Sequence, residues 1–401
     1  MKKTGIKKMI IKILCICLCL AAAVVVANII GNEANIKKTV EYITTLDAVT
    51  PADDVTVEKD ADGFYTIITD RDLKIVQLTD IHIGGGWMSK NSDRLAINAV
   101  ASMITEENPD LVIVTGDISF PSPFRASTFN NQYASTIFAE LMNHLGVYWT
   151  VTFGNHDAEG FNLYNREKMG DFYEDEKWEK CLFLKGDESI DGVGNSIIRV
   201  KNTDGVITQA LFTIDSNDYP KKGGGYDNIH ENQIEWYKTM CEKLNEENKS
   251  SGNVNSLVFM HIPPVEYQTA WSEFEENGYK DTENVKYYYG TLGENVCCPA
   301  TDDLFFETIL EMNSTKGIFV GHDHVNTFSM DYMGIRLTYG MSIDYVAYGG
   351  IEKKGTQRGC TVITVKPDGT FDCYPENYYQ DKYENPQKEK VTMQQLNEEF
   401  N

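Results

Sequence analysis

The stretch Val151-Thr152-Phe153-Gly154-Asn155-His156-Asp157 changes character at its glycine. Apolar and β-branched residues precede Gly154, and an amide, an imidazole and a carboxylate follow it without a gap. A short apolar run that stops at a glycine is typical of a buried β-strand. Taken alone, the polar end predicts an Asx-type turn, because Asn and Asp form such turns through local hydrogen bonds. The same pattern recurs elsewhere in the chain, and the recurrence favours a functional site.

Apolar strands and amphipathic helices alternate around this stretch. Strand, helix, strand, helix, strand is the order of a wound α/β sheet, and the second half of the chain repeats it less regularly. From residue 327 onward strands dominate. The main predicted elements are strands over 73–79, 111–115, 147–153, 256–260 and 317–320, and helices over 91–107, 126–145, 231–248 and 302–312.

Five of these strands stop at a side chain that is able to bind a metal. In wound α/β sheets, ligand sites lie beyond the carboxyl ends of the strands. Residues i and i+2 of extended backbone point the same way, so Asp80 with His82 can present two ligands to one place, as can His322 with His324. Glycines precede three of the side chains and permit sharp turns. The predicted metal ligands are Asp80, His82, Asp117, Asn155, His261, His322 and His324.

Mixed imidazole and carboxylate donors suit Mn, Fe, Zn or Ni rather than calcium. The set is too large for one ion and about right for two ions that share a carboxylate. Two-metal sites clamp and polarise a phosphoryl group and generate hydroxide as the nucleophile. A single strand-end Asp or His is more often a cap or a hydrogen-bonded core residue, but five in succession are hard to assign to chance. Of the remaining histidines, His144 is expected on a helix and His230 at the surface or near the site.

In order and spacing, these motifs resemble those of the calcineurin-like metallophosphoesterases. The shared blocks are Asp-x-His at Asp80, Gly-Asp at Gly116, Gly-Asn-His-Asp at Gly154, a lone histidine at His261 and Gly-His-x-His at Gly321. The resemblance covers residues 73–374. It implies a four-layer α/β fold, in which two mixed β-sheets pack as a sandwich flanked by helices.

The resemblance also implies a role for each residue. Asp80, His82 and His324 would hold one metal, Asn155, His261 and His322 the other, and Asp117 would bridge them. His156 would face the phosphate and assist the leaving group, with Asp157 orienting its imidazole. The implied activity is metal-dependent phosphomonoester hydrolysis with a metal-bound hydroxide as nucleophile. Two alternatives stay open: a phosphodiesterase acting on nucleotides, lipids or envelope polymers, and an inactive binding module with the same fold.

Within the family, the sequence looks most like the purple-acid-phosphatase-like branch. The supporting stretches are His261-Ile262-Pro263-Pro264, residues 321–326 and Cys297-Cys298-Pro299. True purple acid phosphatases read Gly-Asp-x-x-Tyr, whereas the corresponding residue here is Phe120. A phenyl ring cannot coordinate ferric iron, so we expect a colourless or weakly coloured protein.

The N-terminus predicts export. Residues 13–30 carry no charge and are almost wholly apolar, which is near the lower limit for crossing a bilayer. The segment is either a signal anchor, leaving a single-pass membrane protein with an extracellular catalytic domain, or a signal peptide cleaved near Val25-Val26-Ala27 to release a secreted one. The predicted division is 1–30 for this segment, 31–53 for a tether, 54–374 for the catalytic domain and 375–401 for a polar tail. Lysines 2, 3, 7, 8 and 12 precede the apolar run.

The chain is strongly acidic, with a formal net charge of −24 over 401 residues. Such a surface repels nucleic acid and argues against an electrostatic nucleic-acid binder. An anionic phosphate-ester substrate is compatible with it, because bound metal cations reverse the local field. Two long inserts, 160–193 and 263–300, are rich in aromatic residues and are predicted to be binding loops.

Six cysteines lie outside the apolar N-terminal segment, and export makes disulfides permissible. Cys360 and Cys373 flank a predicted hairpin, so they are the first pair to consider. Free buried thiols are an equally good interpretation. The six are Cys181, Cys241, Cys297, Cys298, Cys360 and Cys373.

Overall fold

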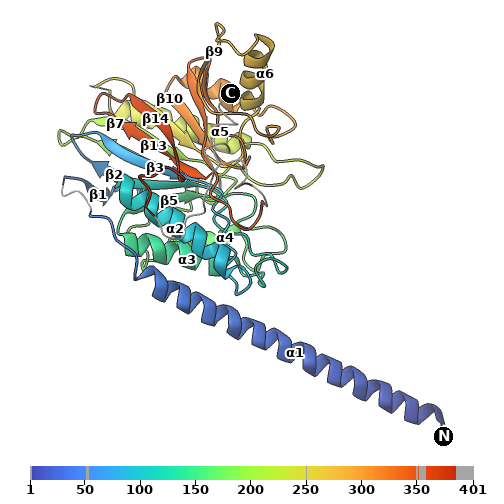
Figure 1. The fold of residues 1–401 in the computed structure, drawn as a ribbon. Coiled ribbons are helices and arrows are strands. Elements are labelled where there is room, and N and C mark those ends of the chain that lie inside the picture. Colours follow the sequence, from blue (N-terminus) through green and yellow to red (C-terminus); the bar gives the residue numbers. More distant parts are fainter. Residues whose placement is uncertain (1, 51–53, 250, 349–350, 352–357, 385–401) are drawn as a thin grey trace.

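The computed structural model describes residues 2–50, 54–249, 251–348, 351 and 358–384 (Figure 1). Two mixed β-sheets pack face to face, with helices on both outer sides. The smaller sheet has five strands in the order β14 (Phe371–Asn377), β13 (Gly359–Val365), β3 (Leu73–Leu78), β4 (Leu111–Thr115) and β5 (Tyr148–Thr152). Strands β3, β4 and β5 are parallel, and β13 is antiparallel to both of its neighbours.

The larger sheet has nine strands and is also mixed. Its central strands β7, β8, β10 and β12 are parallel, and antiparallel strands extend it on both sides. The order is β1 (Thr56–Lys59), β2 (Tyr65–Ile68), β6 (Ser196–Lys201), β7 (Ile207–Thr213), β8 (Ser256–Phe259), β10 (Thr315–Val320), β12 (Ile335–Tyr339), β11 (Ser329–Tyr332) and β9 (Val285–Tyr289).

Helices cover the outer face of each sheet and give a four-layer sandwich. Against the five-stranded sheet pack α2 (Lys90–Glu107), α3 (Asn131–Leu145) and α4 (Arg166–Tyr173). Against the nine-stranded sheet pack α5 (Glu231–Glu247), α6 (Glu266–Glu276) and α7 (Phe305–Met312). The predicted fold class is therefore confirmed, and the predicted strands at 256–260 and 317–320 lie in the nine-stranded sheet.

The alternation of side chains in β3 shows why four of its six residues are apolar. Leu73 and Ile75 face the layer between the sheets, where Phe259 and Phe319 stack at 5.1 Å. Val76 and Leu78 face the opposite side, toward the helices. A strand buried on both faces needs an apolar residue at nearly every position, and the five-residue run of β4 follows the same rule.

The N-terminal helix α1 runs from Lys2 to Ile43, beyond the predicted apolar segment. A tether was expected from residue 31, but the helix continues because its later turns pack on the domain: Asn32 and Ile43 are buried, and Asn32 donates to the Ser127 carbonyl at 3.1 Å. Upstream of Asn28 the side chains described, from Lys7 on, are exposed. Within the described residues, α1 is the one helix whose length and composition fit a membrane span, and a signal sequence fits equally well.

The C-terminal boundary also differs from the prediction. Strand β14 extends to Asn377, and beyond it Tyr378, Tyr379 and Tyr383 are buried in the core of the five-stranded sheet. The hydroxyl of Tyr383 donates to Glu107 at 2.7 Å. The domain therefore reaches at least to residue 384, and the rest of the predicted tail, with a short helix expected over 393–400, lies outside the described residues.

None of the nine cysteines forms a disulfide in the structure. The Cys360–Cys373 pairing is wrong because Cys373 pairs in register with Ile363, three residues from Cys360. Residues an odd number apart on a strand point to opposite faces. Cys360 accordingly lies in the helix-side core, and Cys373 packs against the layer between the sheets.

The two long inserts are largely structural. The first contains α4, and its Tyr173 and Phe183 rings are buried. The second contains α6 and the edge strand β9, and its Phe274 is buried against Tyr287. The prediction that their aromatic residues form binding loops is wrong for these side chains, which fill the cores under the loops.

Candidate metal centre

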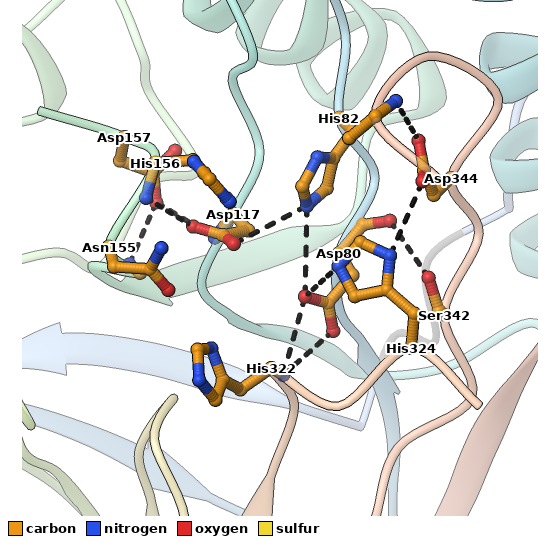
Figure 2. A network of polar contacts seen from close by, with 12 residues as sticks. Asp80, His82, Asp117, Asn155, His156, Asp157, His322, His324, Ser342 and Asp344 are labelled. Atoms are coloured by element: carbon orange, nitrogen blue, oxygen red, sulfur yellow. Dashed lines mark hydrogen bonds and ion pairs between the residues drawn. The ribbon is translucent and has the colours of Figure 1, made fainter. Parts of the chain in front are cut away.

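The carboxyl ends of five strands, three from one sheet and two from the other, meet at one edge of the sandwich. Asp80 and His82 follow β3, Asp117 follows β4, and Asn155 with His156 follows β5. From the nine-stranded sheet, His261 follows β8, and His322 and His324 follow β10. Figure 2 shows most of these side chains converging. The structure thus brings together all seven predicted ligands.

The first group of donors contains Asp80, His82, Asp117 and His324, all buried, with one ligand atom from each lying within 4.8 Å of the others. His82 Nε2 is 3.3 Å from Asp117 Oδ2 and 3.7 Å from Asp80 Oδ1. His324 Nε2 is 3.4 Å from Asp80 Oδ1. Two imidazoles and two carboxylates around one point are a suitable shell for a transition-metal ion.

The second group contains Asn155, His261 and His322 and shares Asp117 with the first. His261 Nε2 lies 3.3 Å from Asp117 Oδ2 and 3.2 Å from Asn155 Oδ1. His322 Nδ1 lies 3.3 Å from His261 Nε2. Asp117 Oδ2 is therefore equally distant from a histidine of each group, as a carboxylate shared by two ions would be.

Several of these atoms are buried without a hydrogen-bond partner. They include Asp117 Oδ2, both ring nitrogens of His82 and Nε2 of His322. A buried polar atom left unpaired costs free energy, and two of these atoms, Asp117 Oδ2 and His82 Nε2, lie 3.3 Å apart within the first group of donors. The donor set and its unpaired atoms fit a pair of cations.

The carboxylates and imidazoles of the site shift one another's pKa values. Burial alone would raise the pKa of Asp117, but His261 and His156 hold it well below its usual range. Burial alone would lower the pKa of His261, yet Asp117 and Asp80 raise it to about 9. Burial and the neighbouring His261 lower the pKa of His322 to about 3, so that its ring is neutral. The carboxylates thus create a buried place that stabilises positive charge.

The backbone of the site is unusual. Asp80, His82, Asp117 and His322 all have positive φ, between 49° and 77°. Non-glycine residues seldom adopt this conformation, and when they do they cluster at functional sites. The predicted extended backbone at Asp80–His82 and His322–His324 is therefore wrong, and sharp turns rather than strand pleating bring each pair together.

Two glycines make close approach of these turns feasible. A Cβ at Gly154 would collide with the carboxylate of Asp117, and one at Gly321 would collide with Thr79 Oγ1 and Asp80 Oδ2. Both residues precede predicted ligands in the sequence. This bears out the expectation that glycine permits close packing there.

The role expected for Asp157 needs correction. The carboxylate of Asp157 accepts hydrogen bonds from the backbone N–H groups of Asp117, Ser119 and Gly154 at 2.8–2.9 Å. It therefore braces two turns, and no hydrogen bond joins it to the His156 ring within the described residues. His156 Nδ1 instead lies 2.8 Å from Glu159 Oε1. Glu159 orients the imidazole, which is partly exposed.

Two further residues of the site were not predicted. Asp344 lies 3.3 Å from His324 Nδ1 and accepts from the N–H groups of Val346 and Ala347. It follows β12, a parallel neighbour of β10, so the strand-end rule would have found it. The hydroxyl of Tyr219 accepts from Asn155 Nδ2 at 3.1 Å. Tyr219 lies in a glycine-rich loop with no signal of its own.

Phe120 lies beside the first group of donors. Its ring centroid is 5.4 Å from that of His82 and 5.0 Å from that of His156. The phenyl ring borders the centre and has no donor atom. Elsewhere, His230 begins α5 and is paired with Asp191 and Asp227, and His144 Nε2 contacts the Leu46 carbonyl, so neither belongs to the cluster.

This chain matches one protein-family model and is similar in sequence to several known proteins. A family model described as calcineurin-like phosphoesterase matches residues 73–326. "Probable inactive purple acid phosphatase 29" of Arabidopsis thaliana is 27% identical over 323 residues, which span 73% of this chain and 77% of that protein. "Probable inactive purple acid phosphatase 28" of the same plant is 28% identical over 307 residues, spanning 70% and 72%. Among solved structures, a dimetal phosphatase from Danio rerio covers 77% of this chain and 100% of its own, at 11% identity and a TM-score of 0.44.

Proposed function

The chain belongs to the calcineurin-like phosphoesterase family, and from this we propose that it is an active, metal-dependent phosphomonoesterase. The observation that carries the proposal is the position of Asp117 Oδ2. This buried, unpaired oxygen lies 3.3 Å from His82 Nε2 and 3.3 Å from His261 Nε2, so one carboxylate serves two groups of donors.

In the proposed site, Asp80, His82, Asp117 and His324 hold one ion, and Asp117, Asn155, His261 and His322 hold the second. Bound Mn, Fe, Zn or Ni would supply Lewis acidity that polarises a phosphate ester and acidifies water. Asp344 holds the His324 ring in place through Nδ1, and Tyr219 holds the Asn155 amide. Such partners fix the orientation of ligands and tune their basicity.

His156 performs the proton transfer in this proposal. Glu159 engages Nδ1, which leaves Nε2 to donate a proton to the departing oxygen of the ester. The His156 side chain is 26% exposed, whereas those of His82 and His261 are fully buried, so a substrate can reach the His156 imidazole. The carboxylate of Glu159 fixes the orientation of the ring.

The curated relatives carry the word "inactive" in their names, so a binding module without catalysis is the competing hypothesis. A scaffold that no longer binds metal has no need for buried, unpaired donor atoms, which are costly to keep. The complete donor set therefore supports an enzyme. A phosphodiesterase with the same site remains the alternative within the enzymes.

The test uses the full chain, purified in detergent and stripped of metal. Mn, Zn, Fe and Ni are added back singly, and hydrolysis of p-nitrophenyl phosphate is compared with that of bis-p-nitrophenyl phosphate. We expect metal-dependent monoester hydrolysis that Asp117→Asn abolishes. Asp372→Asn, at an exposed position on β14, is the matched control and should retain full activity. Preference for the diester would establish the alternative, and activity that survives both EDTA and Asp117→Asn would refute the mechanism.

The same assays can distinguish the roles of the neighbouring residues Asn155 and His156. His156→Ala should keep both metals and lose most turnover, because the ring acts on the substrate. Asn155→Ala should lower the metal content, because the amide belongs to the second group of donors. Metal analysis by mass spectrometry measures the difference, and equal loss of metal in both variants would contradict this division.

We also propose that the domain is exported and held at the membrane by α1. The exposed apolar part of the helix, preceded by lysines, supports an anchor with its N-terminus in the cytoplasm. Detection of the intact N-terminus in the membrane fraction tests this, and recovery of a chain beginning near residue 28 in the medium would indicate a cleaved signal peptide.

A further inference from the structure

Exposed apolar side chains gather in the loops around the candidate metal centre. Outside α1, thirteen large apolar or aromatic side chains are exposed in the described residues, and six of them lie in three consecutive loops after β3, β4 and β5. We call these six the apolar rim. They are Trp87, Met88, Phe124, Phe129, Phe161 and Leu163. An apolar patch of this kind at the mouth of a site marks a surface that contacts a partner or a membrane.

The loops that carry the rim are joined to one another. The rings of Phe129 and Phe161 are in edge contact at 6.4 Å, and the N–H of Leu163 donates to the Phe129 carbonyl at 2.8 Å. Phe124 is the most exposed of the six side chains, with 88% of its surface accessible. The loops after β4 and β5 therefore present their rim side chains side by side.

The same loops contact the candidate site. Phe120 lies in the loop that carries Phe124 and Phe129, and its ring centroid is 5.0 Å from that of His156. In the next loop, Asn162 Nδ2 donates to the His156 carbonyl at 3.1 Å, and Phe161 and Leu163 flank this asparagine. The loops that carry the rim therefore lie directly beside His156, whose side chain is 26% exposed.

Helix α1 meets the rim at the point where it leaves the domain. Asn28 accepts from Trp87 Nε1 at 2.8 Å and donates to the Ser127 carbonyl at 2.7 Å. The indole lies against Gly31, where an added Cβ would be 3.4 Å from the ring. Upstream of Asn28 the helix is exposed and apolar, and about 20 such residues cross a bilayer. Figure 1 shows this part of α1 projecting away from the domain.

These observations indicate which kind of surface lies against the apolar rim. A bilayer crossed by the exposed part of α1 has its surface beside Asn28, at the level of Trp87 and Ser127. We propose that the apolar rim rests on that membrane surface, and that the candidate metal centre hydrolyses the phosphate ester of a membrane lipid. The inference rests on the proposed function and specifies its substrate class. The acidic surface does not oppose it, because the anchor replaces electrostatic recruitment.

The reaction is a simple hydrolysis. For phosphatidic acid, the ester P–O bond to the glycerol oxygen breaks, and a new P–O bond forms to the oxygen of water. His156 supplies the proton that converts the leaving oxygen into the hydroxyl of diacylglycerol, a proton released from the attacking water restores His156, and inorganic phosphate is released. No oxidant or further reactant is needed.

The first experiment compares a lipid and a soluble substrate. The full chain is reconstituted in phosphatidylcholine vesicles that contain phosphatidic acid, and phosphate release is measured beside hydrolysis of p-nitrophenyl phosphate. The double variant Phe124→Ser/Leu163→Ser should lose about tenfold in rate on phosphatidic acid, because it removes apolar area from the membrane contact. Its rate on p-nitrophenyl phosphate, which needs no bilayer, reports that the site is still folded.

Met333→Ser is the matched control. Met333 is 50% exposed in the turn between β11 and β12, at the edge of the sheet away from His322. It should leave both rates unchanged. If wild type hydrolyses the soluble ester but not phosphatidic acid, or if the rim variant loses both rates equally, the inference is overturned while the proposed function stands. If neither substrate is hydrolysed with any metal, the proposed function itself fails.

A second experiment detects the contact without catalysis. Phe124→Trp and Met333→Trp are each reconstituted in vesicles with and without brominated phosphatidylcholine. The added fluorescence of Phe124→Trp should be quenched by the brominated lipid, and that of Met333→Trp should not. Absence of quenching at residue 124 would exclude the membrane contact, and a protein partner would then be the occupant to seek.

Discussion

Replacing Asp157 with asparagine should destabilise the fold by about 3 kcal/mol. Asp157 Oδ2 accepts from the N–H groups of Asp117 and Gly154, and Oδ1 accepts from that of Ser119. Asparagine keeps one oxygen, so its amide group must face at least one of these donors. The lost bond to a charged acceptor is worth about 1.5–3 kcal/mol, and the two that remain weaken when the charge is removed.

Urea unfolding of the full chain in detergent, followed by tryptophan fluorescence, measures this change. The titration is done with a chelator, because a metal that binds only the folded state would add its own stabilisation. Asp175→Asn is the matched control. Asp175 is an exposed aspartate whose carboxylate accepts from one backbone N–H, that of Lys177, so its replacement should change stability by less than about 0.5 kcal/mol.

One combination of results would refute the bracing role of Asp157. If Asp157→Asn unfolds within about 1 kcal/mol of wild type while turnover collapses at full metal content, then Asp157 acts on the His156 ring after all. The hydrogen bonds in the structure would then misrepresent its role. A large loss of stability together with partial turnover of the folded fraction supports the bracing role.

Three further predictions follow from other contacts. Glu159→Gln should lower turnover by about 10–100-fold with unchanged metal content and stability, since it weakens only the bond that orients His156; wild-type turnover would contradict this. Iron-loaded protein should lack a strong visible band, because Phe120 offers no donor atom, and Phe120→Tyr is the variant that tests whether a phenolate there restores one. A chain ending at Asn377 should be less stable than one ending at Glu384 by about 5 kcal/mol in urea titrations, because it loses three buried tyrosine side chains; equal stability would show that the segment is dispensable.

The sequence was sufficient to predict where the candidate ligands gather. An apolar run that ends in a glycine and a polar side chain has few structural interpretations, and parallel strands place all such ends at one edge. The same logic covers Asp344, which follows β12 and contacts His324. The two-sheet arrangement came from the family resemblance, since apolar strands look alike whichever sheet they enter.

Side-chain pairing could not be predicted in the same way. Asp157 is adjacent to His156 in sequence, but a sharp turn directs its carboxylate toward the backbone of two neighbouring turns, whereas Glu159 reaches the ring. The register of β13 and β14 likewise decides that Cys360 and Cys373 face opposite sides. The direction of the Asp157 carboxylate depends on turn geometry, and the faces of the two cysteines depend on strand register. Composition and spacing specify neither.

The candidate metal centre draws its donors from both halves of the sandwich. Asp80, His82 and Asp117 extend from the five-stranded sheet, and His324 extends from the nine-stranded one; the second group is divided in the same way. An ion in either position would therefore act as a cross-link between the two sheets, and its binding energy would add to the free energy that resists their separation. Without metal, the protein should therefore be inactive, and less free energy should be needed to separate its two sheets.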